Sequence, residues 1–219
     1  MGSHLTGKNF EFERIKMFLN LFKNLKQRVI WKFDRHLPNK SDNVLIRKWL
    51  PQNDILAHPQ IKLFITHAGY GSILETIYHG VPCLMIPVFM DQFNNAYRSV
   101  QLGFALKLSY NDPNFSEALL MKLVQELLNN QRYFENAKKR QELFHDRPMR
   151  PMETAIYWIE YVIRHKGADH LKLGGAKLPW YRFYFLDVIL FLAVFVFVFL
   201  YILYCITFFT KTASKQKQN

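Results

Sequence analysis

A short segment after a predicted strand has residue types and a spacing suited to binding a phosphate group. Residues 63–66 are typical of a buried strand, and His67, Gly69, Gly71 and Ser72 follow them. The glycines let a ligand approach the backbone, and the helix predicted to begin here offers free amides and the positive end of its dipole. A tight turn with a structural histidine would use the same residues, so both interpretations stay open. A Walker A loop is excluded, because no lysine follows the glycines.

Further polar and aromatic residues lie where the neighbouring elements are predicted to start or end. The indole of Trp49 can stack on a planar base, and the amide of Gln52 can both donate and accept at a base edge. Glu75 can accept hydrogen bonds from adjacent hydroxyls, as on a ribose, and Asp91 with Gln92 suits the hydroxyls of a sugar. Each residue alone has a plainer interpretation: Trp49 as core, Glu75 as surface and Asp91 as a helix N-cap.

The elements that must position these residues alternate between strands and helices. Short apolar strands of this kind, separated by amphipathic helices, predict an α/β fold with a Rossmann-like parallel sheet that has helices on both faces. In such sheets ligands bind beyond the carboxyl ends of the strands, which is where the candidate residues occur. The strands are expected at 29–33, 44–46, 63–66, 83–86 and 104–108, and the helices at 11–27, 53–58, 70–79, 92–102, 116–128, 131–145 and 153–164.

Composition narrows the classes of protein. The 219 residues are 50% hydrophobic, which excludes disorder for most of the chain. Lys and Arg number 29 against 17 acidic residues, but the excess forms no basic patch interleaved with aromatics, so we expect no nucleic-acid partner. The two cysteines, Cys83 and Cys205, exclude a disulfide framework, and neither has a Cys or His partner at the spacing of a metal site.

One segment predicts a membrane span. Residues 188–209 carry no charge, and as a helix at ~1.5 Å per residue they would be about 33 Å long, enough to cross a hydrocarbon core of about 30 Å. Trp180 and Tyr181 precede the segment as an interfacial aromatic belt would. Lysines follow the segment, and the preference for positive charge on the inner side predicts that this tail lies in the cytosol. Lys215 and Lys217 have the spacing of a dilysine retrieval signal, which predicts a single-pass protein of the endoplasmic reticulum membrane. A basic flank that only anchors the helix would use the same lysines, so both interpretations stay open.

Taken together, these motifs resemble the UDP-dependent glycosyltransferases of family 1, and most closely the membrane-bound UDP-glucuronosyltransferases of animals, with insect members nearest in style. The resemblance runs from about Phe10 to the carboxyl terminus. It rests on the block that begins WLPQNDILAHP and continues through FITHAGYGSILETIYHGVPCLMIPVFMDQFNNA, and on HDRP, WIEYVIRHKGADHL and LDVILFL further on. It implies the C-terminal half of a GT-B fold, followed by one transmembrane helix.

The resemblance also implies a role for each candidate residue. The reaction would be the inverting transfer of glucuronic acid or glucose from a UDP-sugar to a small lipophilic hydroxyl compound, without a metal or another cofactor. Trp49 and Gln52 would bind uracil, and Glu75 would bind the ribose. His67 and the backbone of Gly71 and Ser72, in the motif that includes Gly69, would bind the diphosphate. Asp91 and Gln92 would bind the transferred sugar.

The resemblance implies a division of the chain as well. A UDP-sugar-binding domain at 1–168, lacking its first strand, would precede a juxtamembrane linker at 169–187, the transmembrane helix at 188–209 and a basic tail at 210–219. The family's acceptor domain and its catalytic His–Asp pair have no counterpart in this sequence, so no catalytic residue is assigned. Two function classes stay open: a transferase represented by its donor-binding half, and a non-catalytic membrane-anchored module that binds UDP or pairs with full-length relatives.

Overall fold

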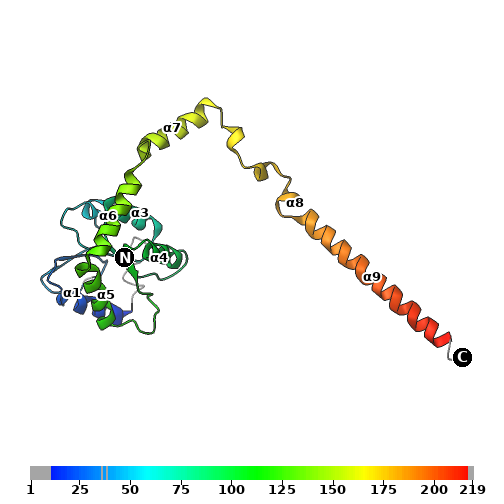
Figure 1. Ribbon diagram of the computed structural model, residues 1–219, viewed down its shortest axis with the longest axis horizontal. Helices are drawn as coiled ribbons and strands as arrows, with labels where there is room; N and C mark the ends of the chain where they lie inside the picture. The colour runs from blue at the N-terminus through cyan, green and yellow to red at the C-terminus, as the bar shows by residue number, and fades with distance from the viewer. Residues whose placement is uncertain (1–10, 36, 38, 217–219) are drawn as a thin grey trace. The chain divides into compact units, whose positions relative to one another are not determined.

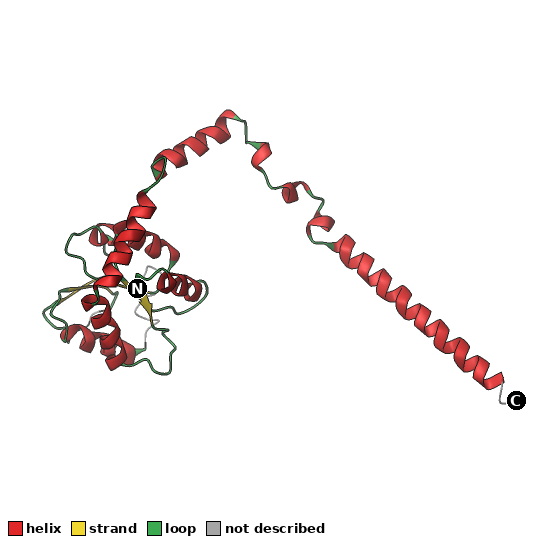
Figure 2. Cartoon of the chain, in the orientation of Figure 1, coloured by secondary structure: helices red, strands yellow, loops and turns green. Residues whose placement is uncertain are grey.

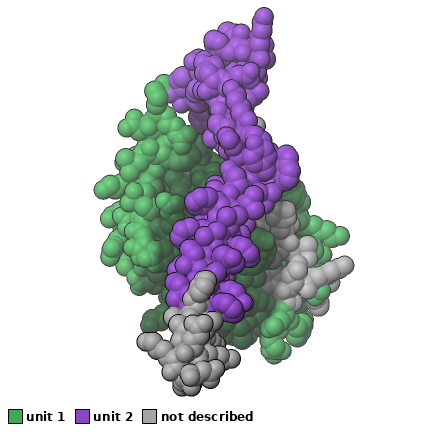
Figure 3. All heavy atoms as spheres, turned by 90° about the vertical axis from the view of Figure 1, so that its right-hand side faces the viewer, with its two compact units in different colours: residues 1–148 green, residues 149–219 purple. Residues whose placement is uncertain are grey.

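The computed structural model describes residues 11–35, 37 and 39–216. They divide into two compact units, residues 1–148 and 149–219, which are coloured separately in Figure 3. Strands and most of the helices lie in the first unit, where Figure 2 shows the strands enclosed by helices. Its elements in chain order are α1 (Phe12–Lys23), β1 (Val29–Lys32), β2 (Val44–Arg47), α2 (Gln52–Leu56), β3 (Phe64–Thr66), α3 (Tyr70–His79), β4 (Cys83–Met85), α4 (Gln92–Gln101), β5 (Ala105–Lys107), α5 (Glu117–Asn129) and α6 (Gln131–His145).

The strands pair in parallel, as the sequence predicts, but they form two sheets. One sheet contains β1 and β2, with Val29 opposite Val44 and Lys32 opposite Arg47. The other has the order β3–β4–β5. The strands β1 and β3 are not hydrogen-bonded to each other, and a large cavity lies between them.

Helices cover both faces of the central strands, which confirms the predicted α/β class. Side chains alternate along β4: Leu84 and Ile86 enter a core with α1 and α5, whereas Cys83 and Met85 enter a core with α3, α4 and α6. In Figure 1 the helices α1 and α5 lie together, and α3 lies beside α6. The strand β4 is therefore buried on both sides, which explains its continuous apolar sequence.

Local sequence signals account for several element ends. The hydroxyl of Ser116 accepts a hydrogen bond from the amide of Leu119 and caps α5, as the sequence predicts. Gly80 ends α3 in the left-handed conformation, with φ of 63°. The predicted bounds of α3 and α6 agree with the structure, and the first helix is shorter than predicted because it ends at Lys23.

The second unit is helical in its described part. Pro151 occupies the first turn of α7 (Pro151–Arg164), where the missing amide costs nothing. The 3₁₀ helices η2 (Asp169–Leu171) and η3 (Gly174–Lys177) and the short α8 (Trp180–Phe183) lead to α9 (Leu186–Gln216). Among the residues that the structure describes, one helical stretch, Leu186–Phe208, is long and apolar enough to cross a membrane.

Candidate functional site

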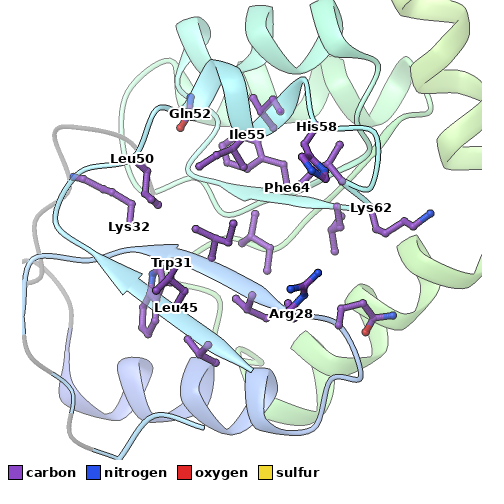
Figure 4. Close-up of a pocket in the computed structure, with 18 of the residues that line it drawn as sticks. Arg28, Trp31, Lys32, Leu45, Leu50, Gln52, Ile55, His58, Lys62 and Phe64 are labelled. Carbon is purple, nitrogen blue, oxygen red and sulfur yellow. The ribbon is translucent and has the colours of Figure 1, made fainter. Parts of the chain in front are cut away.

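The candidate residues lie on the loops and helix starts that follow β2, β3 and β4. Each of these strands belongs to a parallel pair and is followed in the chain by a helix. The loops at the carboxyl ends of the strands therefore lie at one side of the first unit. Figure 4 shows Leu50 and Gln52 at the end of the cavity toward which the strands point, opposite Arg28 and Lys62. Most of the predicted residues therefore reach the same edge, in two connected groups.

The first group surrounds the side chain of Gln52. Its amide Nε2 donates hydrogen bonds to Ser72 Oγ at 3.1 Å and to Glu75 Oε2 at 2.6 Å, which joins α2 to α3. Trp49 and Gly71 line the same cavity as these three residues. The Trp49 side chain is 75% exposed, so it is not a core residue, and its indole is available for stacking.

The second group contains His67 and the turn after β3. His67 is only 8% exposed, and a Cβ added to Gly69 would lie 2.6 Å from its Nε2 atom. The ring therefore lies directly against Gly69, and only a glycine fits there without movement. A Cβ added to Gly71 would meet no atom within 4 Å, so the surface above Gly71 is open. The first turn of α3 thus presents backbone amides beside open space.

Two residues in these loops have a positive φ, which is unusual for residues other than glycine. Ala68 has φ of 66° and is fully buried, and Met90 has φ of 54° and is exposed. Each follows a strand of the three-stranded sheet, β3 or β4. Left-handed conformations cost non-glycine residues about 1–2 kcal/mol, and they are concentrated at functional sites. The loops after β3 and β4 therefore each contain one strained residue.

The remaining two candidate residues, Asp91 and Gln92, follow β4, and Gln92 has a partly structural role. Gln92 is buried, and its Oε1 accepts hydrogen bonds from the amides of Val88 and Phe89 at 2.9 and 3.2 Å. Its side chain oxygen therefore shapes the loop after β4, while Asp91 stays exposed at the start of α4. Asp91 is the N-cap residue of α4, as its plainer interpretation predicts, but its side chain makes no capping hydrogen bond to the helix amides.

Sequence reasoning missed Asn95, which joins the two loops. Its Nδ2 donates to the Ala68 carbonyl at 3.2 Å and to the Asp91 carboxylate at 2.7 Å. Asn95 lies one turn after Asp91 on α4, so helical spacing could have signalled the bond to Asp91. Nothing in the sequence signals the bond to Ala68, because that contact is between different elements.

Two ionisable groups of the first unit, on α3 and β4, have pKa values that are shifted for identifiable reasons. Burial lowers the pKa of His79 at the end of α3, although the charge of Glu75 opposes the shift. Burial also raises the pKa of the Cys83 thiol to about 12. Within the described part of the chain, no group of three or more His, Cys, Asp or Glu side chains is placed to hold a metal ion.

Comparison with known proteins identifies the family. Residues 5–219 match the family described as "UDP-glucoronosyl and UDP-glucosyl transferase", which is nearly the whole chain. The chain belongs to this family. The resemblance seen in the sequence is thereby confirmed.

Members of the UDPGT family from insects and mammals are similar to this chain. "UDP-glycosyltransferase UGT5" of Dactylopius coccus is 46% identical over 88% of this chain, and the match covers 36% of that protein. Human "UDP-glucuronosyltransferase 2B15" is 39% identical over 96% of this chain, and the match covers 40% of that protein. The chain therefore spans less than half the length of these relatives.

Solved structures of glycosyltransferases share the fold. The glycotransferase of kitacinnamycin matches with a TM-score of 0.58 and 27% identity, over 66% of this chain and 37% of that one. Medicago truncatula UGT71G1, solved with UDP-glucose, matches with a TM-score of 0.58 and 23% identity, over 64% of this chain and 34% of that one. These matches support the assignment of the first unit to one half of the GT-B fold.

Proposed function

We propose that the first unit binds the UDP part of a UDP-sugar and forms the donor side of a glycosyltransferase. The observation that carries this proposal is the hydrogen-bonded set of Gln52, Ser72 and Glu75 beside the exposed Trp49. A base and its ribose are adjacent in a nucleoside. An aromatic face, an amide and a carboxylate within hydrogen-bonding distance of one another match that arrangement.

In this proposal Trp49 stacks on uracil and Gln52 pairs with its edge. Glu75 accepts hydrogen bonds from the ribose hydroxyls. These bonds would replace the hydrogen bond at 2.6 Å that Glu75 accepts from Gln52 in the ligand-free protein. Because an unpaired carboxylate is costly where water is partly excluded, this exchange keeps the half-buried Glu75 hydrogen-bonded in both states. The half-buried position of Glu75 supports a role in binding over the plain surface interpretation.

The diphosphate would lie at the start of α3. The amides of Gly71 and Ser72 and the positive end of the helix dipole favour negative charge there. His67 is held against Gly69 at the same turn. Negative charge grows on the departing UDP as the glycosidic bond breaks, so these groups would stabilise the transition state more than the bound substrate.

The transferred sugar would contact the loop after β4. Asp91 offers an exposed carboxylate, which Asn95 holds in place, and Gln92 keeps its amide nitrogen available while its oxygen orders the loop. These groups suit the hydroxyls of glucose or glucuronic acid. UDP-glucose and UDP-glucuronic acid are therefore the donors that we propose.

Calorimetry of the full chain in detergent micelles tests the nucleotide site. Replacing Trp49 by Ala should weaken UDP binding by about 1–3 kcal/mol, on the scale of base–aromatic stacking. The matched control is Trp158→Ala, since Trp158 is also exposed but lies in the second unit. The stacking role is wrong if UDP binds equally well to the wild type and to Trp49→Ala.

We propose a transferase role, in which the acceptor and its catalytic base are supplied from outside the described residues. Positioning and proton transfer are large parts of catalysis, so we expect no glycoside formation from a simple phenol and UDP-glucose by this chain alone. The alternative is a non-catalytic module that binds UDP or pairs with full-length relatives. Turnover that appears when a catalytically weakened full-length relative is added would favour the transferase role, whereas UDP binding without any effect on turnover would favour the alternative.

The apolar stretch Leu186–Phe208 supports a membrane anchor for this function. We propose that it crosses the endoplasmic reticulum membrane once, and that homo- or hetero-oligomers with relatives form there. Lipophilic acceptors concentrate in membranes, so an anchored donor site would lie close to them. Microsome fractionation of the tagged chain would test the location, with recovery in a cytosolic fraction as the contradicting result.

A further inference from the structure

Two tripeptides of the chain match the acceptor sequence for N-linked glycosylation, which is Asn-X-Ser or Asn-X-Thr with any residue except proline at X. These sequons are Asn-Lys-Ser at residues 39–41 and Asn-Phe-Ser at residues 114–116. A glycan is bulky and hydrated, so it needs an asparagine on the surface. Asn39 and Asn114 are both exposed and both lie outside the helices and strands. The contacts of their neighbours therefore distinguish the two sequons.

The first sequon lies on the loop that joins β1 to β2. Asn39 is in a turn, and both Asn39 and Lys40 are exposed. Hydrogen bonds of the following residues hold this loop in place. The Asn43 amide Nδ2 donates to three main-chain carbonyls within residues 22–27, at 2.8 to 3.1 Å, and the Ser41 hydroxyl donates to Asn43 Oδ1 at 2.6 Å. A glycan on Asn39 would break none of these bonds.

The second sequon is built into the folded core. Its middle residue, Phe115, is only 5% exposed, and the guanidinium of Arg14 lies over the Phe115 ring at 4.1 Å from the centroid. Its last residue, Ser116, accepts a hydrogen bond from the amide of Leu119 and caps α5. An enzyme that binds this sequon must lift Phe115 out of the core. In the folded chain the second sequon is therefore closed, whereas the first is open.

The side of the membrane on which the first unit lies decides whether a sequon is used, because N-linked glycans are added on the lumenal side of the endoplasmic reticulum membrane. The residues after the apolar stretch Leu186–Phe208 include Lys211, Lys215 and Lys217 and no acidic residue, which predicts a cytosolic tail. A single crossing then puts the first unit in the lumen. This step rests on the membrane anchor in the proposed function.

We propose that Asn39 is a site of N-linked glycosylation. The co-substrate is an oligosaccharide that is joined to a lipid through a diphosphate. The Asn39 amide nitrogen Nδ2 attacks C1 of the first sugar, so that a C1–N bond forms and the bond from C1 to the diphosphate oxygen breaks. The lipid diphosphate leaves, and the amide loses one proton. The step is a group transfer, and nothing is oxidised or reduced.

The glycan would lie apart from the proposed nucleotide site. The amide of Val29, the first residue of β1, donates to the carbonyl of Asn43 at 2.8 Å. The loop has therefore returned to the amino end of β1 soon after Asn39. Trp49 and Gln52 follow the carboxyl end of β2, which is where ligands bind in parallel sheets. Glycosylation of Asn39 should therefore leave UDP binding unchanged.

Electrophoresis of the full chain from insect cells tests the site. The chain is expressed behind a cleavable signal peptide, and protease protection of intact microsomes checks that the first unit is in the lumen. Removal of N-glycans with an endoglycosidase should increase the mobility of the protein. Asn39→Gln should abolish the glycan at this site, whereas the matched control Asn114→Gln should keep it. Ser41→Ala should also abolish it and Ser41→Thr should restore it, because the sequon needs a hydroxyl at that position.

Mass spectrometry of the protein from native microsomes tests the site without an added signal peptide. Enzymatic removal of an N-glycan from asparagine leaves an aspartate, so the peptide that contains Asn39 should show this change in mass after treatment and not before. Calorimetry should give equal UDP affinities for the glycosylated protein and for Asn39→Gln. Failure of the proposed donor site would appear as a loss of UDP binding by both, with the glycan still present.

Three results would overturn the proposal. The first is a protease-protected first unit whose mobility does not change with endoglycosidase. The second is a glycan that Asn114→Gln removes and Asn39→Gln leaves. The third is a native protein in which Asn39 is unmodified. In that last case, digestion of the first unit by protease in intact native microsomes would assign the failure to the membrane placement, and protection would assign it to the site.

Discussion

Replacing Gly69 by Ala should destabilise the first unit through the ring of His67. A Cβ at this position would lie 2.6 Å from Nε2 and 2.7 Å from Cε1 of His67, so the ring must move. The ring is only 8% exposed and has little room to move. Overpacking of this kind costs about 1–3 kcal/mol. Gly69 is also the N-cap of α3, and Ala is a poorer N-cap than Gly, which adds about 1 kcal/mol.

The neighbouring glycine supplies a control with the opposite sign. A Cβ at Gly71 would meet nothing within 4 Å, and Gly71 lies in the first turn of α3. Ala is a better helix former than Gly, so Gly71→Ala should stabilise the ligand-free protein by about 0.5–1 kcal/mol. The added methyl group would stand where we place the diphosphate, so UDP affinity should fall although stability rises.

Urea unfolding of the full chain in detergent micelles, followed by near-UV circular dichroism, measures these effects. A double-mutant cycle separates the clash from the capping effect. In a His67→Ala background the cost of Gly69→Ala should fall to the capping contribution of about 1 kcal/mol. An equal cost of Gly69→Ala with and without His67 would refute the reasoning, because the clash would then play no part. Calorimetry with UDP on the same variants should show weaker binding for Gly69→Ala and for Gly71→Ala.

Three further outcomes are expected. Burial lowers the pKa of His79 below its usual 6.5, so the unfolded chain binds more protons near that pH. The free energy of unfolding should therefore be highest above pH 6.5 and fall as the pH drops through and below 6.5. The variant His79→Gln should flatten this dependence in urea unfolding measured from about pH 7.5 to 5.5. Burial raises the pKa of Cys83 to about 12, so its thiol should not react in the folded protein at about pH 8. In a Cys205→Ser background, iodoacetamide should label Cys83 only after unfolding. Mass spectrometry that finds labelled folded protein would contradict this. Asn95→Ala removes the link between Ala68 and Asp91 and should weaken UDP-glucose binding more than UDP binding in calorimetry, whereas Asn94→Ala, the exposed neighbour, should change neither.

Most of the elements could be predicted from the sequence because their signals are local. The apolar stripe of α5 and its Ser116 cap lie within one stretch of chain, and so do the bounds of α3 with Gly80 at its end. The GT-B family assignment was equally accessible, because the residues from Trp49 to Gln92 keep a fixed spacing in the chain. The roles of those residues toward a UDP-sugar stay predictions until binding is measured.

The sequence by itself determined the α/β class, the order of the elements, the apolar span and the family, since periodicity, capping and motif spacing all act between residues close in the chain. Only the tertiary structure decided which distant groups meet. It joined Gln52 to Glu75, turned the oxygen of Gln92 toward the amides of Val88 and Phe89, and separated β1 from β3 by a cavity. The physical reason is that strand pairing and side-chain contacts between elements depend on how whole elements pack, and apolar strands of similar sequence do not specify their neighbours.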